Sequence, residues 1–163
     1  MRAGRPRSIQ SIGKTVKLFQ IEEPDGSPVD PDAPGVAIGI DISGAEAEVA
    51  VAVGGNAVVL ADREGFALDL PVPPAAAAAE AWQDLFEAAR LRAERALAQP
   101  VTHAVLTVAS APDAASAALL STAGGAAGLT LLRIVARETL GSRPAALSAA
   151  ILAEDLAPRP GAR

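Results

Sequence analysis

The chain has 163 residues, a net charge of −5 and a hydrophobic fraction of 50%, with one Trp, three Phe and no Tyr. This length predicts one domain with its own core, and the acidic balance gives no reason to expect nucleic-acid binding. The absence of cysteine and the single histidine exclude disulfides, thiolate nucleophiles, cysteine-ligated clusters and multi-histidine metal sites. No apolar run approaches the roughly 20 residues of a membrane span, so we expect no membrane partner.

The first 34 residues differ in composition from the rest. Residues 1–17 carry several basic side chains and no acid: Arg2, Arg5, Arg7, Lys14 and Lys17. Such a run is typical of a solvated, flexible tail, with an anion-docking arm as the alternative. Because no apolar segment follows it, we expect no secretion signal and predict a cytoplasmic protein. Residues 22–35 are acidic and rich in Pro and Gly, which indicates a linker. The ordered domain is therefore predicted over 35–157, with a disordered tail at 158–163.

Three strands are predicted first, over residues 36–42, 48–53 and 57–60, and Gly54-Gly55-Asn56 is expected to form a tight hairpin turn between the last two. A helix is predicted over 81–98, because apolar side chains recur there on one face at helical spacing: Trp82, Leu85, Phe86, Ala89, Ala93, Ala96 and Leu97. On the other face of this helix, Arg90 and Glu94 have the spacing of an ion pair.

The second half of the chain alternates strands and helices. A buried strand is predicted over 102–108, and Ser110 is expected to cap an alanine-rich helix that ends near Gly128. Another strand follows at 129–135. A last helix is predicted from Ser142-Arg-Pro144 onward, with Leu147, Ile151 and Leu152 as its large apolar residues. The order is thus β-β-β-α-β-α-β-α. It predicts an α/β fold of the ribonuclease-H/actin type, in which helices flank a mixed sheet of about five strands.

One motif points to chemistry. The first predicted strand ends at Asp41, the chain then turns through small residues, and a second apolar strand returns. A carboxylate at the end of a buried strand needs a cation or hydrogen-bond donors. The small residues after it would let backbone N–H groups approach a phosphate, although hairpins also use such turns.

Several blocks of sequence carry a family resemblance. Residues 39–47, Gly-Ile-Asp-Ile-Ser-Gly-Ala-Glu-Ala, match the pattern G-I-D-L-G-T-T-N-S. Residues 103–117 follow D-x-V-I-T-V-P-A-Y-F-x-D-A-Q-R without gaps, and residues 127–135 match A-G-L-x-V-L-R-L-L. The sequence Leu-Phe-Gln-Ile-Glu-Glu-Pro at 18–24 stands ahead of the first strand, like L-L-Q-I-x-E-P-G. In this order, the blocks resemble the N-terminal nucleotide-binding lobe of the seventy-kilodalton heat-shock chaperones (DnaK type). They are most similar to the iron–sulfur-assembly branch, HscA.

The resemblance implies a nucleotide site and also its decay. In that family the first loop holds the nucleotide phosphates and its Asp lies near the magnesium-bound water. The matching positions here are Gly39, Asp41, Ser43, Gly44 and Ala45. They imply ATP or ADP with Mg²⁺, bound weakly or not at all, because both threonine hydroxyls of G-T-T are lost.

The groups that would make such a site catalytic are also replaced. The family's essential lysine has no counterpart, since the only lysines lie in the basic tail. Its catalytic Glu aligns with Arg137, and Glu138 follows one position late. The length of the chain between the matched blocks leaves no room for the family's second subdomain. No catalytic residue and no metal ligand are therefore predicted, and ATP hydrolysis is not expected.

Three hypotheses follow for function. The first is a non-catalytic, chaperone-like module that binds a protein partner, either a chaperone-system component with a link to iron–sulfur cluster assembly or a second copy of itself. The second is a weak ATP-binding protein or ATPase that uses the residual phosphate loop at Asp41. The third is a non-functional gene remnant. The strand that ends in Asp41 favours the second hypothesis. The lack of the family's lysine and of its second subdomain favours the first or the third.

Overall fold

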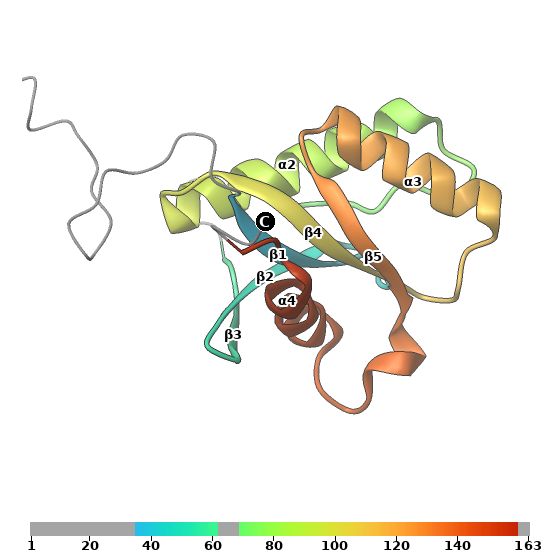
Figure 1. Cartoon of the computed structure of the whole chain (residues 1–163). Coiled ribbons are helices and arrows are strands. Elements are labelled where there is room, and N and C mark those ends of the chain that lie inside the picture. The colour runs from blue at the N-terminus through green and yellow to red at the C-terminus, as the bar shows by residue number, and fades with distance from the viewer. Residues whose placement is uncertain (1–34, 62–68, 160–163) are drawn as a thin grey trace, which may run out of the picture. The chain divides into compact units, whose positions relative to one another are not determined.

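A mixed sheet forms the centre of the fold in the computed structural model, which describes residues 35–61 and 69–159. The sheet contains β1 (Val36–Asp41), β2 (Glu48–Val53), β3 (Asn56–Val59), β4 (Val101–Val108) and β5 (Thr130–Ala136), in the order β3-β2-β1-β4-β5 (Figure 1). Strand β2 runs antiparallel to both β1 and β3, while β4 and β5 run parallel to β1. This arrangement confirms the predicted α/β fold of the ribonuclease-H/actin type.

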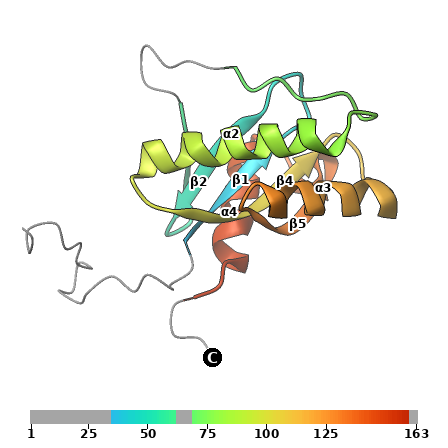
Figure 2. The same ribbon diagram turned by 90° about the horizontal axis from the view of Figure 1, so that it is seen from above.

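The helices are divided between the two faces of the sheet. Helices α2 (Ala79–Leu97) and α3 (Ala114–Ala126) lie side by side over one face, and α4 (Ala145–Leu156) lies over the other (Figure 2). A short 3₁₀ helix, η1 (Arg137–Leu140), connects β5 to α4 and has no counterpart in the sequence prediction. Because β1, β4 and β5 are parallel, their carboxyl ends meet at one edge of the sheet, which we call the carboxyl edge.

The face below α2 and α3 is packed with large side chains. Phe86 is fully buried, and its ring lies 6.4 Å from that of Trp82, at an interplanar angle of 32°. These rings share one core cluster with the isoleucines of β1, Ile38 and Ile40, which alternate with residues of the opposite face as strand geometry requires. The predicted apolar stripe of α2 is thus confirmed for most of its members. It is wrong for Ala96, which lies past the last buried turn and is exposed.

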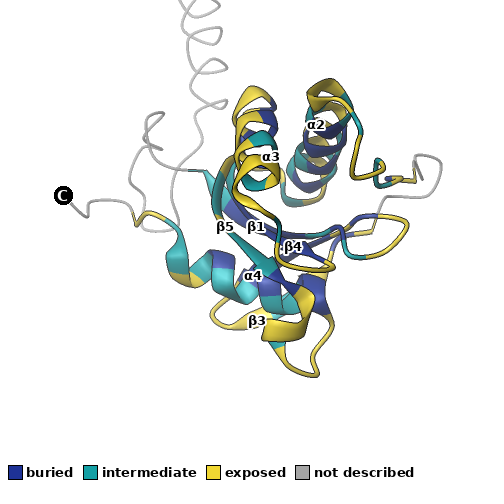
Figure 3. Ribbon diagram, turned by 90° about the vertical axis from the view of Figure 1, so that its right-hand side faces the viewer, coloured by how far each residue is buried: buried dark blue, intermediate teal, exposed yellow. Residues whose placement is uncertain are grey.

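The face below α4 is packed with alanine. Buried alanines of α4 contact small residues of the strands: Ala146 and Ala150 lie against β2, and Ala149 and Ala153 lie against β1 and β4. Gly39 of β1 makes this contact possible, since a Cβ atom there would collide with the backbone nitrogen of Ala150. The larger side chains of α4, such as Leu147 and Ile151, are only half-buried at the margin (Figure 3).

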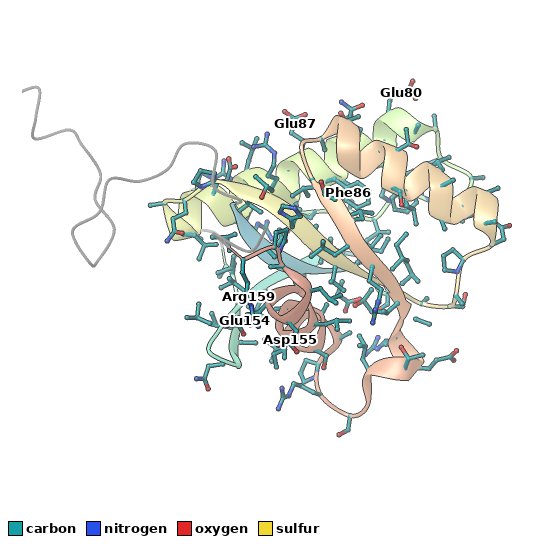
Figure 4. The ribbon with its side chains drawn as sticks, in the orientation of Figure 1. Glu80, Phe86, Glu87, Glu154, Asp155 and Arg159 are labelled. Carbon is teal, nitrogen blue, oxygen red and sulfur yellow. The ribbon has the colours of Figure 1, made fainter. Side chains whose placement is uncertain are left out.

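The hairpin of β2 and β3 is fastened to the end of α4. Its turn is formed by Gly54 and Gly55, whose φ angles of 60° and 80° suit the tight turn predicted from the sequence, while Asn56 already belongs to β3. Both glycine N–H groups donate to the carboxylate of Glu154, at 2.5 and 2.9 Å. Glu154 lies near the end of α4 (Figure 4). One side chain of α4 therefore holds the turn of the hairpin through two hydrogen bonds, in addition to the pairing of β2 with β1.

Two predicted side-chain interactions, an ion pair on α2 and the N-cap of α3, can be compared with the structure. The Arg90–Glu94 ion pair is confirmed at 3.0 Å, and Arg90 Nε also donates to the carbonyl of Ala127. The predicted Ser110 cap is wrong, because α3 begins three residues later. Asp113 is the N-cap, and its carboxylate accepts the N–H of Ser116 at 2.7 Å. This hydrogen bond lowers the pKa of Asp113.

The predicted basic tail and acidic linker lie outside the described residues. The described domain starts at Gly35. The last helix ends at Leu156.

Candidate nucleotide site

Asp41 is the residue on which the sequence prediction depends, and it is the last residue of β1. It is paired with Glu48 on β2 and with Thr107 on β4, so it lies at the middle of the carboxyl edge. Its side chain is half-buried, and its Oδ1 atom accepts the backbone N–H of Ser43 at 2.9 Å. The carboxylate thus finds a hydrogen-bond donor within its own loop, as an aspartate in an Asx turn does.

The loop after Asp41 is held by the chain that returns to the sheet ahead of α2. The carbonyl of Ala45 accepts the N–H of Val72 at 2.9 Å, and the N–H of Ala47 donates to the carbonyl of Leu70 at 2.7 Å. Gly44 and Ala45 are exposed, and a Cβ atom on Gly44 would meet nothing nearer than 3.9 Å. This backbone pairing fixes the loop and leaves its tip open to solvent.

Gly39 lies apart from the open tip of this loop. It is buried in the middle of β1, where the backbone of α4 covers it. The absence of a side chain at this position is explained by helix packing, because a Cβ atom would also lie 2.7 Å from the carbonyl oxygen of Ala146. A contact of Gly39 with nucleotide stays a prediction.

Arg137 comes to the same edge from β5. It opens η1, directly after the strand, and its Nη1 atom lies 3.5 Å from the hydroxyl oxygen of Ser43. Glu138, the displaced counterpart of the family's catalytic carboxylate, is exposed beside it. A guanidinium therefore lies against the loop, and the sequence alignment had placed this residue where a chaperone has its acid.

Thr107 adds an unsatisfied group near Asp41. Both residues lie on the α4 side of the sheet, since each is two positions beyond a residue that α4 covers. Thr107 is fully buried, and its hydroxyl has no hydrogen-bond partner within the described part of the chain. A buried hydroxyl without a partner costs about 1–3 kcal/mol. No pattern in the sequence would have singled this residue out.

The described residues hold no candidate metal-binding group, and a shallow depression lies away from Asp41. Among residues 35–61 and 69–159, no group of three or more His, Asp or Glu side chains is placed to hold a metal ion. A shallow depression of about 330 Å³ is lined by Glu94, Ala98, Gln99 and Pro100, which precede β4. It therefore lies at the amino end of the parallel strands, opposite the carboxyl edge.

His103 lies near the amino end of β4, away from Asp41. Its Nδ1 atom is 2.7 Å from the hydroxyl oxygen of Thr102, and partial burial lowers its pKa from the ordinary value of 6.5. His103 is paired with Ala37, near the start of β1, whereas Asp41 is at the end of β1 and is paired with Thr107. The side chains of His103 and Asp41 therefore lie at opposite ends of the sheet. His103 is thus not a member of the candidate nucleotide site.

The fold and the arrangement at the carboxyl edge define the class of this protein: an α/β domain of the ribonuclease-H/actin type. No protein-family model matches the chain, and no curated protein matches it. The kinship with the seventy-kilodalton chaperones therefore stays a prediction that rests on the sequence blocks. No helix within the described ranges is long and apolar enough to cross a membrane.

Proposed function

We propose that this chain is a non-catalytic, chaperone-like module that acts by binding a protein partner and does not hydrolyse ATP. The proposal is supported by two contacts at the carboxyl edge of the sheet, one made by Asp41 and one made by Arg137. Asp41 is satisfied by the N–H of Ser43, and the position of the expected catalytic acid is taken by Arg137, 3.5 Å from the Ser43 hydroxyl.

The chemistry of phosphoryl transfer supports this proposal. Transfer of a phosphoryl group depends on positioning the reactants and on stabilising charge, usually through Mg²⁺ and a properly placed lysine, arginine or carboxylate. At this edge the loop offers backbone donors and one serine hydroxyl, and Glu138 is exposed to solvent. Arg137 stands in the place of the expected acid, and the Oδ1 atom of Asp41 already accepts the N–H of Ser43, so we expect neither residue to act as a general base.

The partner class follows from the sequence resemblance. A lobe that keeps its fold after losing its catalytic groups is expected to act through its surface. We therefore propose a chaperone-system component, an iron–sulfur assembly protein or a second copy of the chain as the partner, in the cytoplasm.

One observation favours a second function, weak nucleotide binding. The guanidinium of Arg137 and the exposed tip at Gly44 and Ala45 together offer a positive charge beside open backbone, a combination that attracts phosphate. Arg137 and the loop would then hold the phosphates of ATP or ADP with Mg²⁺, and Asp41 would supply the negative charge for the metal.

Isothermal titration of the full chain with Mg-ATP and Mg-ADP, together with a phosphate-release assay, tests these functions. We expect no phosphate release and no heat of binding. Heat that disappears in both Asp41→Ala and Arg137→Ala would support the second function. Glu87→Ala is the control, since Glu87 is an exposed carboxylate on α2 (Figure 4). Steady phosphate release that Asp41→Ala abolishes would contradict the proposed function.

A further inference from the structure

Strand β3 forms one edge of the sheet, and the direction of its backbone groups can be derived from its pairing. The N–H of Leu60 donates to the carbonyl of Val49 at 2.7 Å, so these two opposed residues are a hydrogen-bonded pair. Hydrogen-bonded and non-bonded pairs alternate along antiparallel strands. Val58, opposite Val51, therefore points its N–H and C=O groups toward β2, whereas Ala57 and Val59 point theirs away from the sheet.

Three valines on β3 and at the adjoining end of β2 are exposed. The exposed fractions are 73% for Val53, 57% for Val58 and 42% for Val59. Val53 and Val58 follow the alternation of buried Val51 and lie on the α2 side, and Val59 lies on the α4 side. No charged residue occurs from position 53 to position 61. Natural edge strands are normally protected by a lysine, a proline or a bulge.

The opposite edge of the sheet, β5, has such protection. Arg133 lies at the centre of β5 and is exposed. If two copies paired antiparallel through β5 about its centre, the two Arg133 side chains would face each other, and like charges directly opposite destabilise a strand pair. The same operation on β3, centred on Val58, places Ala61 opposite Gly55 and brings no like charges together. Of the two edges, only β3 accepts its own copy without charge conflict.

We propose that a second copy of this chain adds to β3 in antiparallel register about a two-fold axis at Val58. Ala57 exchanges backbone hydrogen bonds with the partner's Val59, and Val58 faces the partner's Val58. This inference rests on the proposed partner-binding function and names its partner. A two-fold axis makes every contact occur twice, and the two five-stranded sheets become one continuous sheet.

The size of the contact sets the expected strength. Strand β3 has 4 residues, so the interface belongs to the small class below about 1,200 Å², in which association is weak. We therefore expect a dimer whose population rises with protein concentration, rather than a permanent one.

Sedimentation velocity of the full chain over a range of concentrations tests this inference. The wild type is expected to shift from monomer to dimer, whereas Val58→Lys and Val58→Asp are each expected to stay monomeric because like charges face each other. An equimolar mixture of the two variants is expected to restore the dimer, since Lys then faces Asp. Circular dichroism and thermal unfolding verify that both variants fold, as the exposure of Val58 predicts.

A second pair of variants tests the backbone contact. Ala57→Pro removes an N–H that points away from β2, so it is expected to abolish the dimer and leave the fold intact, because proline is tolerated at a strand edge. Ala57→Thr keeps that N–H and is expected to dimerise. A wild type that stays monomeric at every concentration overturns the inference, as does association that survives in all variants. Neither result bears on ATP, so the titration above still judges the proposed function independently.

Discussion

The two faces of the sheet are covered by different kinds of packing. On one face, two helices bring Trp82 and Phe86 onto the sheet, and large side chains fill the space between the layers. On the other face, a single helix lies so close that backbone atoms of α4 approach Gly39 directly. A chain with few large side chains can thus fill one core with its large residues and form the other by bringing a helix backbone close to the sheet. The two cores should therefore respond in opposite ways to a change in side-chain size.

The largest effect is expected from removing volume below α2. Phe86→Ala leaves a cavity at a fully buried site and is expected to lower the free energy of unfolding by about 3–5 kcal/mol, as measured by denaturant titration. Leu91→Ala is the control on the same helix, because Leu91 is 39% exposed, and its effect should be within about 0.5–1 kcal/mol. Equal losses for the two variants would show that the first core does not depend on buried volume.

The next effect is expected from adding volume below α4. Gly39→Ala places a Cβ atom against backbone atoms that can move only with the whole helix, and it should cost about 1–3 kcal/mol of unfolding free energy. The same substitution at Gly125 meets no atom within 4 Å and should raise stability by about 0.5–1 kcal/mol through helix propensity. If Gly39→Ala were as harmless as Gly125→Ala, close approach would not explain this glycine.

The smallest effect concerns the polar group buried on the α4 side. Thr107→Val replaces an unpartnered hydroxyl by a methyl group of similar shape and is expected to raise the free energy of unfolding by about 1 kcal/mol. Thr102→Val is the matched control, because the Thr102 hydroxyl contacts His103 and its loss should lower stability by about 1 kcal/mol. A loss of stability in Thr107→Val would indicate that its hydroxyl has a partner after all, such as a bound water near Asp41.

At the carboxyl edge, the end of β1 could be predicted from the sequence, whereas the contacts of Asp41 and Arg137 could not. The prediction that an apolar strand runs into Asp41 is confirmed, since β1 ends at this residue, while a phosphate-binding role for the loop after it stays a prediction. The sequence did not show that the N–H of Ser43 would donate to the carboxylate of Asp41, or that Arg137 would lie beside Ser43. The contact of Arg137 with Ser43 joins residues 94 positions apart, so it depends on the path of the chain outside the motif. The sequence comparison indicated only that an arginine stands where the family has an acid.

Errors in the helix predictions have a similar origin. Ser110 and Asp113 are both good N-cap residues, and the sequence gives no means of deciding which one the helix uses. In the structure α3 begins after Asp113, whose carboxylate accepts the N–H of Ser116. On α4 the sequence did not indicate which residues face the sheet; the alanines do, because only small side chains fit over Gly39.

By itself, the sequence determined the order of strands and helices, the hairpin turn at Gly54 and Gly55, the aromatic stripe of α2 and the place of Asp41. Each of these depends on residues near one another in the chain, where periodicity and turn preferences act. The tertiary structure alone decided the role of Gly39, the hold of Glu154 on the hairpin, the burial of the Thr107 hydroxyl and the unprotected edge of β3. Those features join residues far apart in the sequence. They depend on how the helices pack on the sheet and on which strands pair, and neither can be read from local sequence.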